Sequence, residues 1–292
     1  MMPNTIEIPK DLSPWQETIL PNFDRRKVFV LPGAFYSQIV ALMAACNMEK
    51  ADTIKEADIV VFAGGADVNP ALYGQRPLRE TSWHAERDDV EVAAWVEATE
   101  RNKILFGICR GAQFLHVMNS GQLWQHVEGH GGSNHMIVDI ETGDTVVANS
   151  IHHQMLMPND EMEIIAICKQ QVSNVFLAEG AEGTAELEIE AGSYAEDRSF
   201  FVQGHPEVGS DTYRSWCMNR LLEHVLDWED FDDESLDDDG DEGIESVMGE
   251  DFKKAMLISY LMFLKETVSD EEVRAEKIVK AVEDFYIDLE RK

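Results

Sequence analysis

Three residues of the sequence have the types and settings needed for nucleophilic chemistry: Cys109, His205 and Glu207. Cys109 lies between two glycines in Gly107-Ile108-Cys109-Arg110-Gly111, a cysteine version of the Gly-x-Ser-x-Gly elbow. Such an elbow holds an exposed nucleophile at a strained turn, and its glycines allow close backbone approach. The N-terminus of the following helix would favour the thiolate. The alternative is that Cys109 is a buried structural cysteine.

The segment from Phe200 to Glu207 contains the groups that a thiolate needs. His205 and Glu207 are two residues apart, so both side chains point the same way on an extended segment. Pro206 keeps the preceding residue extended. The histidine can take the thiol proton, while the carboxylate orients the imidazole and stabilises the imidazolium. His-Pro-Glu alone is a weak signal, but it becomes strong when a cysteine elbow precedes it.

The elements around these residues predict an α/β fold. Apolar runs predict strands at 27–31, 59–63 and 104–108, and helical periodicity predicts helices at 36–46, 88–99 and from Gln113 onward. This alternation predicts a parallel sheet with helices on both faces and a site beyond the carboxyl ends of its strands. Further strands are expected at 136–140, 145–147, 164–168, 175–177, 185–190 and 200–203, followed by a closing helix at 211–228.

Five segments together resemble a known family. They are Phe62–Gly74 with its Gly64-Gly65-Ala66-Asp67 loop, Glu86-Arg87-Asp88 with Glu91, the elbow with Gln113, Asn149–Gln154, and Val202–Glu207. Over residues 27–226 the chain resembles the class I glutamine amidotransferase-like superfamily, and within it the γ-glutamyl-γ-aminobutyrate hydrolase type, which is peptidase C26-like. Two features depart from that pattern. Gly204 replaces a usual aromatic residue, which predicts a more open pocket, and the segment 182–198 is longer and more acidic.

The resemblance implies a fold and a set of roles. The fold would be a flavodoxin-like parallel sheet sandwiched by helices, with an added antiparallel β portion. Cys109 would be the nucleophile, His205 the base and then the acid, and Glu207 the orienting carboxylate. The backbone N–H groups of Gly65 and Arg110 would form the oxyanion hole. Substrate contacts would come from Gly64, Asp67, Gln113, Ser150 and His152. For Gln113 a solvent-facing helix position is the alternative, and for His152 and His153 a turn at a strand end.

No metal or other cofactor is expected from the spacing of possible ligands. His126, His130 and His135 lie in a glycine-rich segment, but no cysteine stands near them in the sequence. Zinc sites usually combine such histidines with cysteines at short spacing. The segment is therefore interpreted as the connection that follows the nucleophile helix.

Composition restricts the partners and the compartment. The formal net charge is −32, from 56 acidic and 24 basic residues, which argues against nucleic acid and against an anionic membrane surface. No apolar run approaches the roughly 18 residues that span a bilayer. Met1–Asp24 lacks the pattern of a signal peptide. The four scattered cysteines suggest reduced thiols. A cytoplasmic location is expected.

Four regions are expected along the chain: an N-terminal extension (1–26), a catalytic domain (27–228), an acidic linker (229–251) and a C-terminal α-helical hairpin (252–292). The run from Asp237 to Glu242 could suggest calcium, but the ligand register of a calcium-binding loop fails, which favours a self-repelling linker. The apolar positions of the hairpin predict self-association or contact with a partner.

The leading hypothesis is hydrolysis of a γ-glutamyl amide through a glutamyl-thioester on Cys109. One alternative is a glutaminase subunit that supplies ammonia to a separate synthetase or amidoligase, with glutamine as substrate. A third class is a non-catalytic binding scaffold.

Overall fold

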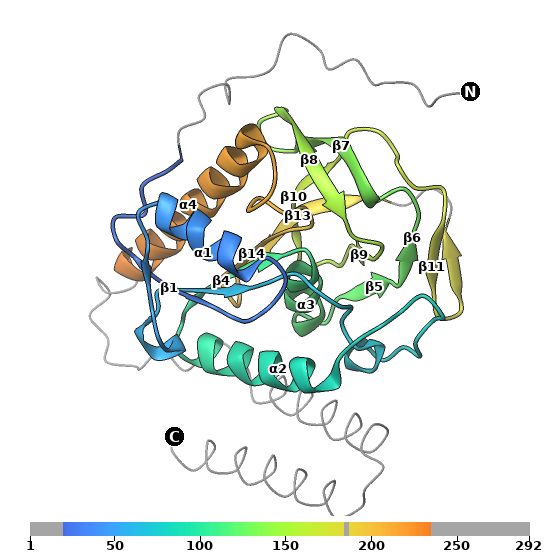
Figure 1. Cartoon of the computed structure of the whole chain (residues 1–292), viewed down its shortest axis with the longest axis horizontal. Coiled ribbons are helices and arrows are strands. Elements are labelled where there is room, and N and C mark those ends of the chain that lie inside the picture. Colours follow the sequence, from blue (N-terminus) through green and yellow to red (C-terminus); the bar gives the residue numbers. More distant parts are fainter. Residues whose placement is uncertain (1–19, 184–186, 235–292) are drawn as a thin grey trace, which may run out of the picture.

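A nine-stranded sheet is the centre of the computed structural model, which describes residues 20–183 and 187–234. Its strand order is β2-β1-β3-β4-β14-β13-β10-β7-β8 (Figure 1). The first five strands are mutually parallel, and the remaining neighbours are antiparallel. The predicted α/β fold with an added antiparallel portion is therefore confirmed. The strands of this sheet are β1 (Lys27–Val30), β2 (Glu49–Lys50), β3 (Ile59–Phe62), β4 (Ile104–Ile108), β7 (Gly131–Asp139), β8 (Thr145–Ile151), β10 (Glu163–Cys168), β13 (Ile189–Tyr194) and β14 (Ser199–Val202).

Two smaller sheets lie beside the main one. One joins β12, β11 and β6, and the other pairs β5 with β9. The helices comprise four α-helices among the described residues and two short 3-10 turns. The bounds of these elements are β5 (Gln122–Trp124), β6 (His126–Val127), β9 (Met155–Met157), β11 (Phe176–Ala178), β12 (Ala181–Gly183), α1 (Tyr36–Ala45), α2 (Ala85–Glu100), α3 (Arg110–Met118), α4 (Asp211–Glu234), and the turns Ile54–Glu56 and Pro70–Tyr73.

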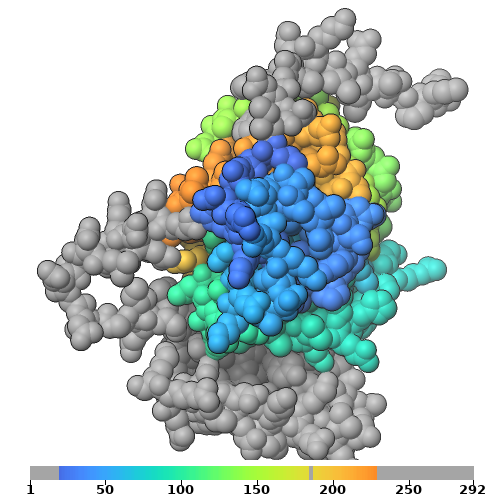
Figure 2. Space-filling view, turned by 60° about the vertical axis from the view of Figure 1, so that its left-hand side comes forward, coloured from blue at the N-terminus to red at the C-terminus, as the bar shows by residue number. Residues whose placement is uncertain are grey.

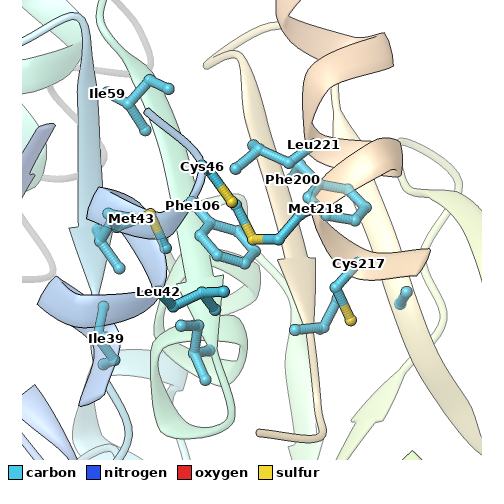
Figure 3. Packing of buried hydrophobic residues seen from close by; sticks show 14 of the residues in the cluster. Ile39, Leu42, Met43, Cys46, Ile59, Phe106, Phe200, Cys217, Met218 and Leu221 are labelled. Carbon is cyan, nitrogen blue, oxygen red and sulfur yellow. The ribbon is translucent and has the colours of Figure 1, made fainter. Parts of the chain in front are cut away.

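The central parallel strands β3, β4 and β14 are buried on both faces, because helices cover each side. Side chains alternate along β3, so that Ile59 and Val61 face α1 and α4. Val60 and Phe62 face α2 and α3 on the other side. Figure 3 shows the first of these two cores, in which α1 and α4 residues pack against Phe106 and Phe200. In Figure 2 the blue N-terminal elements lie at the surface beside the orange α4.

Several boundaries differ from those predicted. The nucleophile helix begins at Arg110, directly after the cysteine, and not at Gln113. The strand expected at 185–190 is instead β13, Ile189–Tyr194. The glycine-rich segment interpreted as a loop contains β6 and the start of β7. Each strand difference reflects pairing with a partner strand, β6 with β11, β7 with β8, and β13 with both β10 and β14, and local propensity does not encode such pairing.

The last helix also extends beyond its expected end. α4 reaches Glu234, within the range assigned to the acidic linker. Arg220 of α4 makes two hydrogen bonds to the Asp139 carboxylate, both 2.7 Å long, and thereby fixes this helix to the end of β7. Most of the N-terminal extension, the remainder of the linker and the hairpin lie outside the described residues. Their predicted roles stay predictions. Among the described residues, no helix is both long and apolar enough to cross a membrane.

Candidate active site

The cysteine elbow forms where β4 ends and α3 begins. Cys109 has φ 54° and ψ −107°, a positive-φ conformation that is strained for a residue with a side chain. A Cβ on Gly111 would lie 2.0 Å from the carbonyl oxygen of Phe62, and one on Gly107 would lie 2.8 Å from the amide nitrogen of Ala112. Both glycines are therefore required by close packing, as predicted. The Cys109 side chain is covered, with 6% exposure for the residue, and not exposed as the elbow pattern suggested.

His205 follows the carboxyl end of β14, the strand that pairs with β4. Its Nδ1 lies 2.7 Å from Oε1 of Glu207. A Cβ on Gly64 would lie 3.6 Å from both the Cys109 Cβ and the His205 Nε2, so the cysteine and the imidazole both border this glycine. The ring of Phe35 packs against the imidazole at a centroid distance of 5.2 Å. The structure thus brings the three predicted catalytic residues to one place.

The electrostatics of this group favour a charged imidazole. Burial opposes protonation of His205, but hydrogen bonds with Cys109 and Glu207 outweigh it and raise its pKa to about 10. With Nδ1 engaged by the carboxylate, Nε2 is the nitrogen left to exchange a proton with the thiol. The arrangement can form a thiolate–imidazolium pair and direct the sulfur at an electrophilic carbon.

The expected oxyanion donors lie at the ends of neighbouring strands. Gly65 follows β3 and has φ 149°. Arg110 is the first residue of α3, so its N–H has no acceptor within the helix. The positive φ of Gly65 favours glycine, and a Cβ there would also displace the Arg87 guanidinium. Because β3 and β4 are adjacent and parallel, both N–H groups lie at the same edge of the sheet. Their role as the oxyanion hole stays a prediction.

A buried charge network supports this edge. The guanidinium of Arg110 pairs with Asp88 and Glu91 of α2, and all three side chains are almost fully buried. Arg87 bonds Glu91 at 2.8 Å and donates to the carbonyl oxygen of Ala63 at 2.8 Å. Burial is the largest influence on both partners: it raises the pKa of Asp88 to about 6 and lowers the pKa of Arg110 to about 9. The sequence marked Arg87, Asp88 and Glu91 as a motif without giving their function, which is to hold the start of α3 and the glycine loop.

The residues predicted to bind substrate have different surroundings. Asp67 accepts a hydrogen bond from Ser82 N at 2.8 Å and lies 3.0 Å from Nε2 of His153. Gln113 is buried and donates to the carbonyl oxygen of Gln154 at 3.4 Å, so its solvent-facing alternative is wrong.

Ser150 and His152 make their contacts within the protein. Ser150 donates to the carbonyl oxygen of His130 at 2.6 Å. His152 Nδ1 lies 2.9 Å from the carbonyl oxygen of Gln154, and its Nε2 lies 3.9 Å from Glu190. The substrate-binding roles of Gly64, Asp67, Gln113, Ser150 and His152 stay predictions.

The glycine that departs from the family pattern does not open a pocket. A Cβ on Gly204 would lie 2.4 Å from the hydroxyl of Tyr213 and 2.8 Å from the carbonyl oxygen of Asn149. Tyr213 of α4 is fully buried. An aromatic side chain from another element therefore occupies the space beside position 204, and the expectation of a more open pocket is wrong at this point.

Strand pairing also assembles a cluster of possible metal ligands that the sequence did not reveal. His130, His135, Cys168 and Glu190 are all buried, and their ligand atoms lie within 4.8 Å of one another. The interpretation that no cysteine joins these histidines is therefore wrong. His126 is not a member of this cluster.

Comparison with known proteins identifies the family. The Peptidase C26 profile matches residues 34–207, which is more than half of the chain. The chain therefore belongs to the Peptidase C26 family, within the class I glutamine amidotransferase-like superfamily, and the resemblance inferred from its motifs is confirmed.

Individual relatives are similar to parts of this chain. A glutamine amidotransferase-like protein of Lactococcus lactis, YvdE, is 28% identical over 56% of this chain and 74% of its own length. Protein NtpR of Enterococcus hirae is 31% identical over 53% of this chain and 69% of its own length. The carbamoyl phosphate synthase small chain of Ralstonia nicotianae is 28% identical over 41% of this chain and 29% of its own length. A solved structure of a glutamine amidotransferase from Thermotoga maritima is 13% identical over 73% of this chain and 86% of its own chain, with a TM-score of 0.45.

Proposed function

We propose that this protein hydrolyses a γ-glutamyl amide through a covalent glutamyl-thioester on Cys109. The observation that carries the proposal is the grouping of Cys109, His205 and Glu207, in which the carboxylate holds Nδ1 of the imidazole at 2.7 Å and the other ring nitrogen and the cysteine both border Gly64. Membership of the Peptidase C26 family supports action on amide bonds. The resemblance of the motifs supports a γ-glutamyl substrate.

The first half of the reaction forms the thioester. Nε2 of His205 takes the thiol proton, and the sulfur of Cys109 attacks the γ-carbonyl carbon of the substrate. The negative charge that develops on the carbonyl oxygen is stabilised by the N–H groups of Gly65 and Arg110, each worth about 3 kcal/mol in comparable sites. The carbon–nitrogen bond then breaks, and the leaving amine takes the proton from His205.

The second half regenerates the enzyme. His205 removes a proton from water, and the hydroxide attacks the thioester carbonyl carbon. The carbon–sulfur bond breaks, glutamate leaves, and the thiolate of Cys109 regains its proton from the imidazolium. Glu207 keeps the imidazole oriented through both halves without being protonated itself.

Product analysis tests this proposal. The full-length protein is incubated alone with a γ-glutamyl amine and, separately, with glutamine, and the free amine and ammonia are measured. We expect release of free amine without any partner, and no release by Cys109→Ala. A covalent glutamyl adduct on Cys109, trapped by acid quench and found by mass spectrometry, would support the thioester. Absence of any product from both substrates would contradict the hydrolase.

The second candidate is a glutaminase subunit that delivers ammonia to a separate synthetase. The similarity to a carbamoyl phosphate synthase small chain favours this candidate over a non-catalytic scaffold. It predicts that glutamine is hydrolysed slowly by the isolated chain and faster in the presence of a cognate synthetase. Ammonia that appears only with such a partner, with no hydrolysis of γ-glutamyl amines, would select it.

A further inference from the structure

Three strands and the turn before one of them bring a set of metal-ligating side chains to one buried point. His130 precedes β7, His135 lies within β7, Cys168 ends β10, and Glu190 is in β13. Their residue exposures are 0%, 6%, 9% and 0%. We propose that these four residues, hereafter the histidine–cysteine cluster, form a structural binding site for a zinc ion.

Strand register explains how these distant positions meet. Cys168 pairs with Ile137 across β10 and β7, and His135 is two residues before Ile137. Because cross-strand partners and alternate residues share a face, His135 and Cys168 point to the same side of the sheet. The main-chain N–H of Cys168 bonds the carbonyl oxygen of Glu188 at 2.9 Å, which places Glu190 beside both.

The distances between the ligand atoms suit a tetrahedral ion. Oε1 of Glu190 lies 2.8 Å from His135 Nε2, 3.3 Å from Cys168 Sγ and 3.6 Å from His130 Nδ1. Zinc binds nitrogen and oxygen at about 2.0–2.2 Å and sulfur at about 2.3 Å, which puts neighbouring ligand atoms about 3.3–3.8 Å apart. Small movements of the side chains around the centre would therefore complete the coordination.

The outer contacts of the cluster have the pattern that supports metal ligands. Nε2 of His130 lies 3.5 Å from the Glu188 carboxylate, which is itself fixed by the main-chain N–H groups of Val172 and Ser173. A ligating histidine commonly directs its second nitrogen at such a carboxylate. Nδ1 of His130 then faces Glu190 at 3.6 Å and the Ser150 hydroxyl at 3.3 Å, and since that hydroxyl donates to the His130 carbonyl oxygen at 2.6 Å, Nδ1 can bind an ion.

The cluster and its neighbour His152 also contain buried polar atoms that are unsatisfied. Among the described residues, Oε2 of Glu190, Nε2 of His130, Nδ1 of His135 and Nε2 of His152 are buried without a hydrogen-bond partner, and of these the His152 nitrogen lies 3.9 Å from Oε1 of Glu190. Such atoms are uncommon in folded proteins and indicate an unseen ion or water. The Glu190 carboxylate is fully buried, and a cation near it would balance its charge.

The donor set identifies zinc. One thiolate, two imidazoles and one carboxylate in tetrahedral reach are typical zinc ligands, whereas magnesium and calcium need six or more oxygen ligands. Binding releases the thiol proton of Cys168 and the proton shared by His135 and Glu190 to solvent. Four protein ligands leave no open position for substrate, so the ion is structural.

The site would also stabilise the segment beside the catalytic residues. The carbonyl oxygen of His130 accepts a hydrogen bond from the hydroxyl of Ser150, and the preceding residue, Asn149, bonds both main-chain polar atoms of His205. An ion that fixes His130 therefore steadies the strand end that holds the catalytic histidine.

Metal analysis tests the proposal in a background that lacks the catalytic thiol, because Cys109 and His205 are a second thiol–imidazole pair. Full-length Cys109→Ser protein is produced with added zinc and dialysed into metal-free buffer. Inductively coupled plasma mass spectrometry should then find one zinc per chain. Cys109→Ser/Cys168→Ser should lose it, while the matched control Cys109→Ser/Cys46→Ser keeps it.

Cobalt substitution provides a readout that does not depend on the folding of a variant. Cobalt-loaded Cys109→Ser protein should show tetrahedral ligand-field bands and a near-ultraviolet thiolate charge-transfer band. Zinc-loaded Cys109→Ser protein should also melt at a higher temperature than the same protein stripped of metal. Absence of zinc and of the charge-transfer band in Cys109→Ser would overturn the proposal, as would retention of both in a folded Cys109→Ser/Cys168→Ser variant.

Discussion

Asn149 holds His205 by both of its main-chain polar atoms. Nδ2 of Asn149 donates to the carbonyl oxygen of His205 at 3.0 Å, and its Oδ1 accepts from the amide nitrogen of His205 at 3.0 Å. Asn149 is in β8, which is an edge strand of the sheet. His205 follows β14, and in the sheet β13, β10 and β7 lie between β14 and β8. The antiparallel portion of the fold thus positions the proposed catalytic base, which follows β14 of the parallel portion.

This relationship predicts that Asn149→Ala lowers kcat by about 10²-fold with little change in KM, since misplacement of a catalytic group by about 1 Å has that effect. Steady-state kinetics and a thermal melt measure it. The matched control is Asn159→Ala, which removes hydrogen bonds to Met162 N and Tyr194 away from the site. Equal kcat losses in the two variants would show that Asn149 has only a structural role.

The nucleophile can be identified by selective labelling. We expect iodoacetamide at neutral pH to modify Cys109 first, and Cys109→Ala to abolish both turnover and this labelling. Cys46 and Cys217 serve as controls because both are fully buried. Burial raises the pKa of the Cys46 thiol to about 12 and the pKa of Cys217 well above its ordinary value. Peptide mass spectrometry after timed labelling decides the order, and an inert Cys109 would refute the assignment.

The protonation state of His205 should couple stability to pH. Burial alone would lower its pKa, but Cys109 and Glu207 outweigh burial and raise the pKa from 6.5 to about 10. The stabilisation that the imidazolium contributes is therefore complete below about pH 6.5 and is lost as the pH rises through 10. The difference in free energy of unfolding between wild type and His205→Gln should shrink over that interval. Denaturant titrations at several pH values measure it, and a constant difference would contradict it.

The carboxylate partner should matter less than the base itself. Glu207→Gln should lower the His205 pKa, which imidazole NMR can follow, and reduce kcat by about 10²–10⁴-fold. His205→Ala should remove nearly all activity. Full activity of Glu207→Gln across the pH range would reduce the triad to a cysteine–histidine dyad.

The buried ion pair behind the elbow should be costly to break. Asp88→Ala leaves Arg110 without one of its buried partners and should lower the free energy of unfolding by about 3–5 kcal/mol. Glu97→Ala is the control, because it removes an exposed pair between this helix and Arg101, the residue directly after it, and should cost less than about 1 kcal/mol. Urea unfolding compares the two, and similar costs would mean that the buried network contributes little.

Gly111 should tolerate no side chain. Gly111→Ala places a Cβ against the carbonyl oxygen of Phe62, so a substitution that usually favours a helix should instead destabilise the protein by at least about 3 kcal/mol. Gly131→Ala meets no atom within 4 Å and should change stability by less than about 0.5 kcal/mol. Thermal and urea unfolding of both variants provide the comparison. A stable Gly111→Ala protein would show that α3 can move away from β3.

The residues proposed to be catalytic could be predicted from the sequence because local patterns indicate them. The elbow needs glycine on both sides of Cys109 for steric reasons, and His205 and Glu207 share one extended segment, so the signals lie within a few residues of each other. The alternating strands and helices before residue 110 follow equally local hydrophobic periodicity. The boundary of α3 was misplaced because the helix starts directly after the strained Cys109.

What the sequence could not reveal depends on strands that meet only in the folded protein. Cys168 and Glu190 are distant from His130 and His135 in the chain, and only the antiparallel pairing of β7, β10 and β13 makes them neighbours. The same applies to Asn149 against His205 and to Tyr213 beside Gly204. The sequence by itself determined the α/β class and indicated Cys109 and His205 as the proposed nucleophile and base, since local spacing and periodicity carry these signals. Tertiary structure alone decided the histidine–cysteine cluster and the supports of the site, because register between distant strands has no local signature.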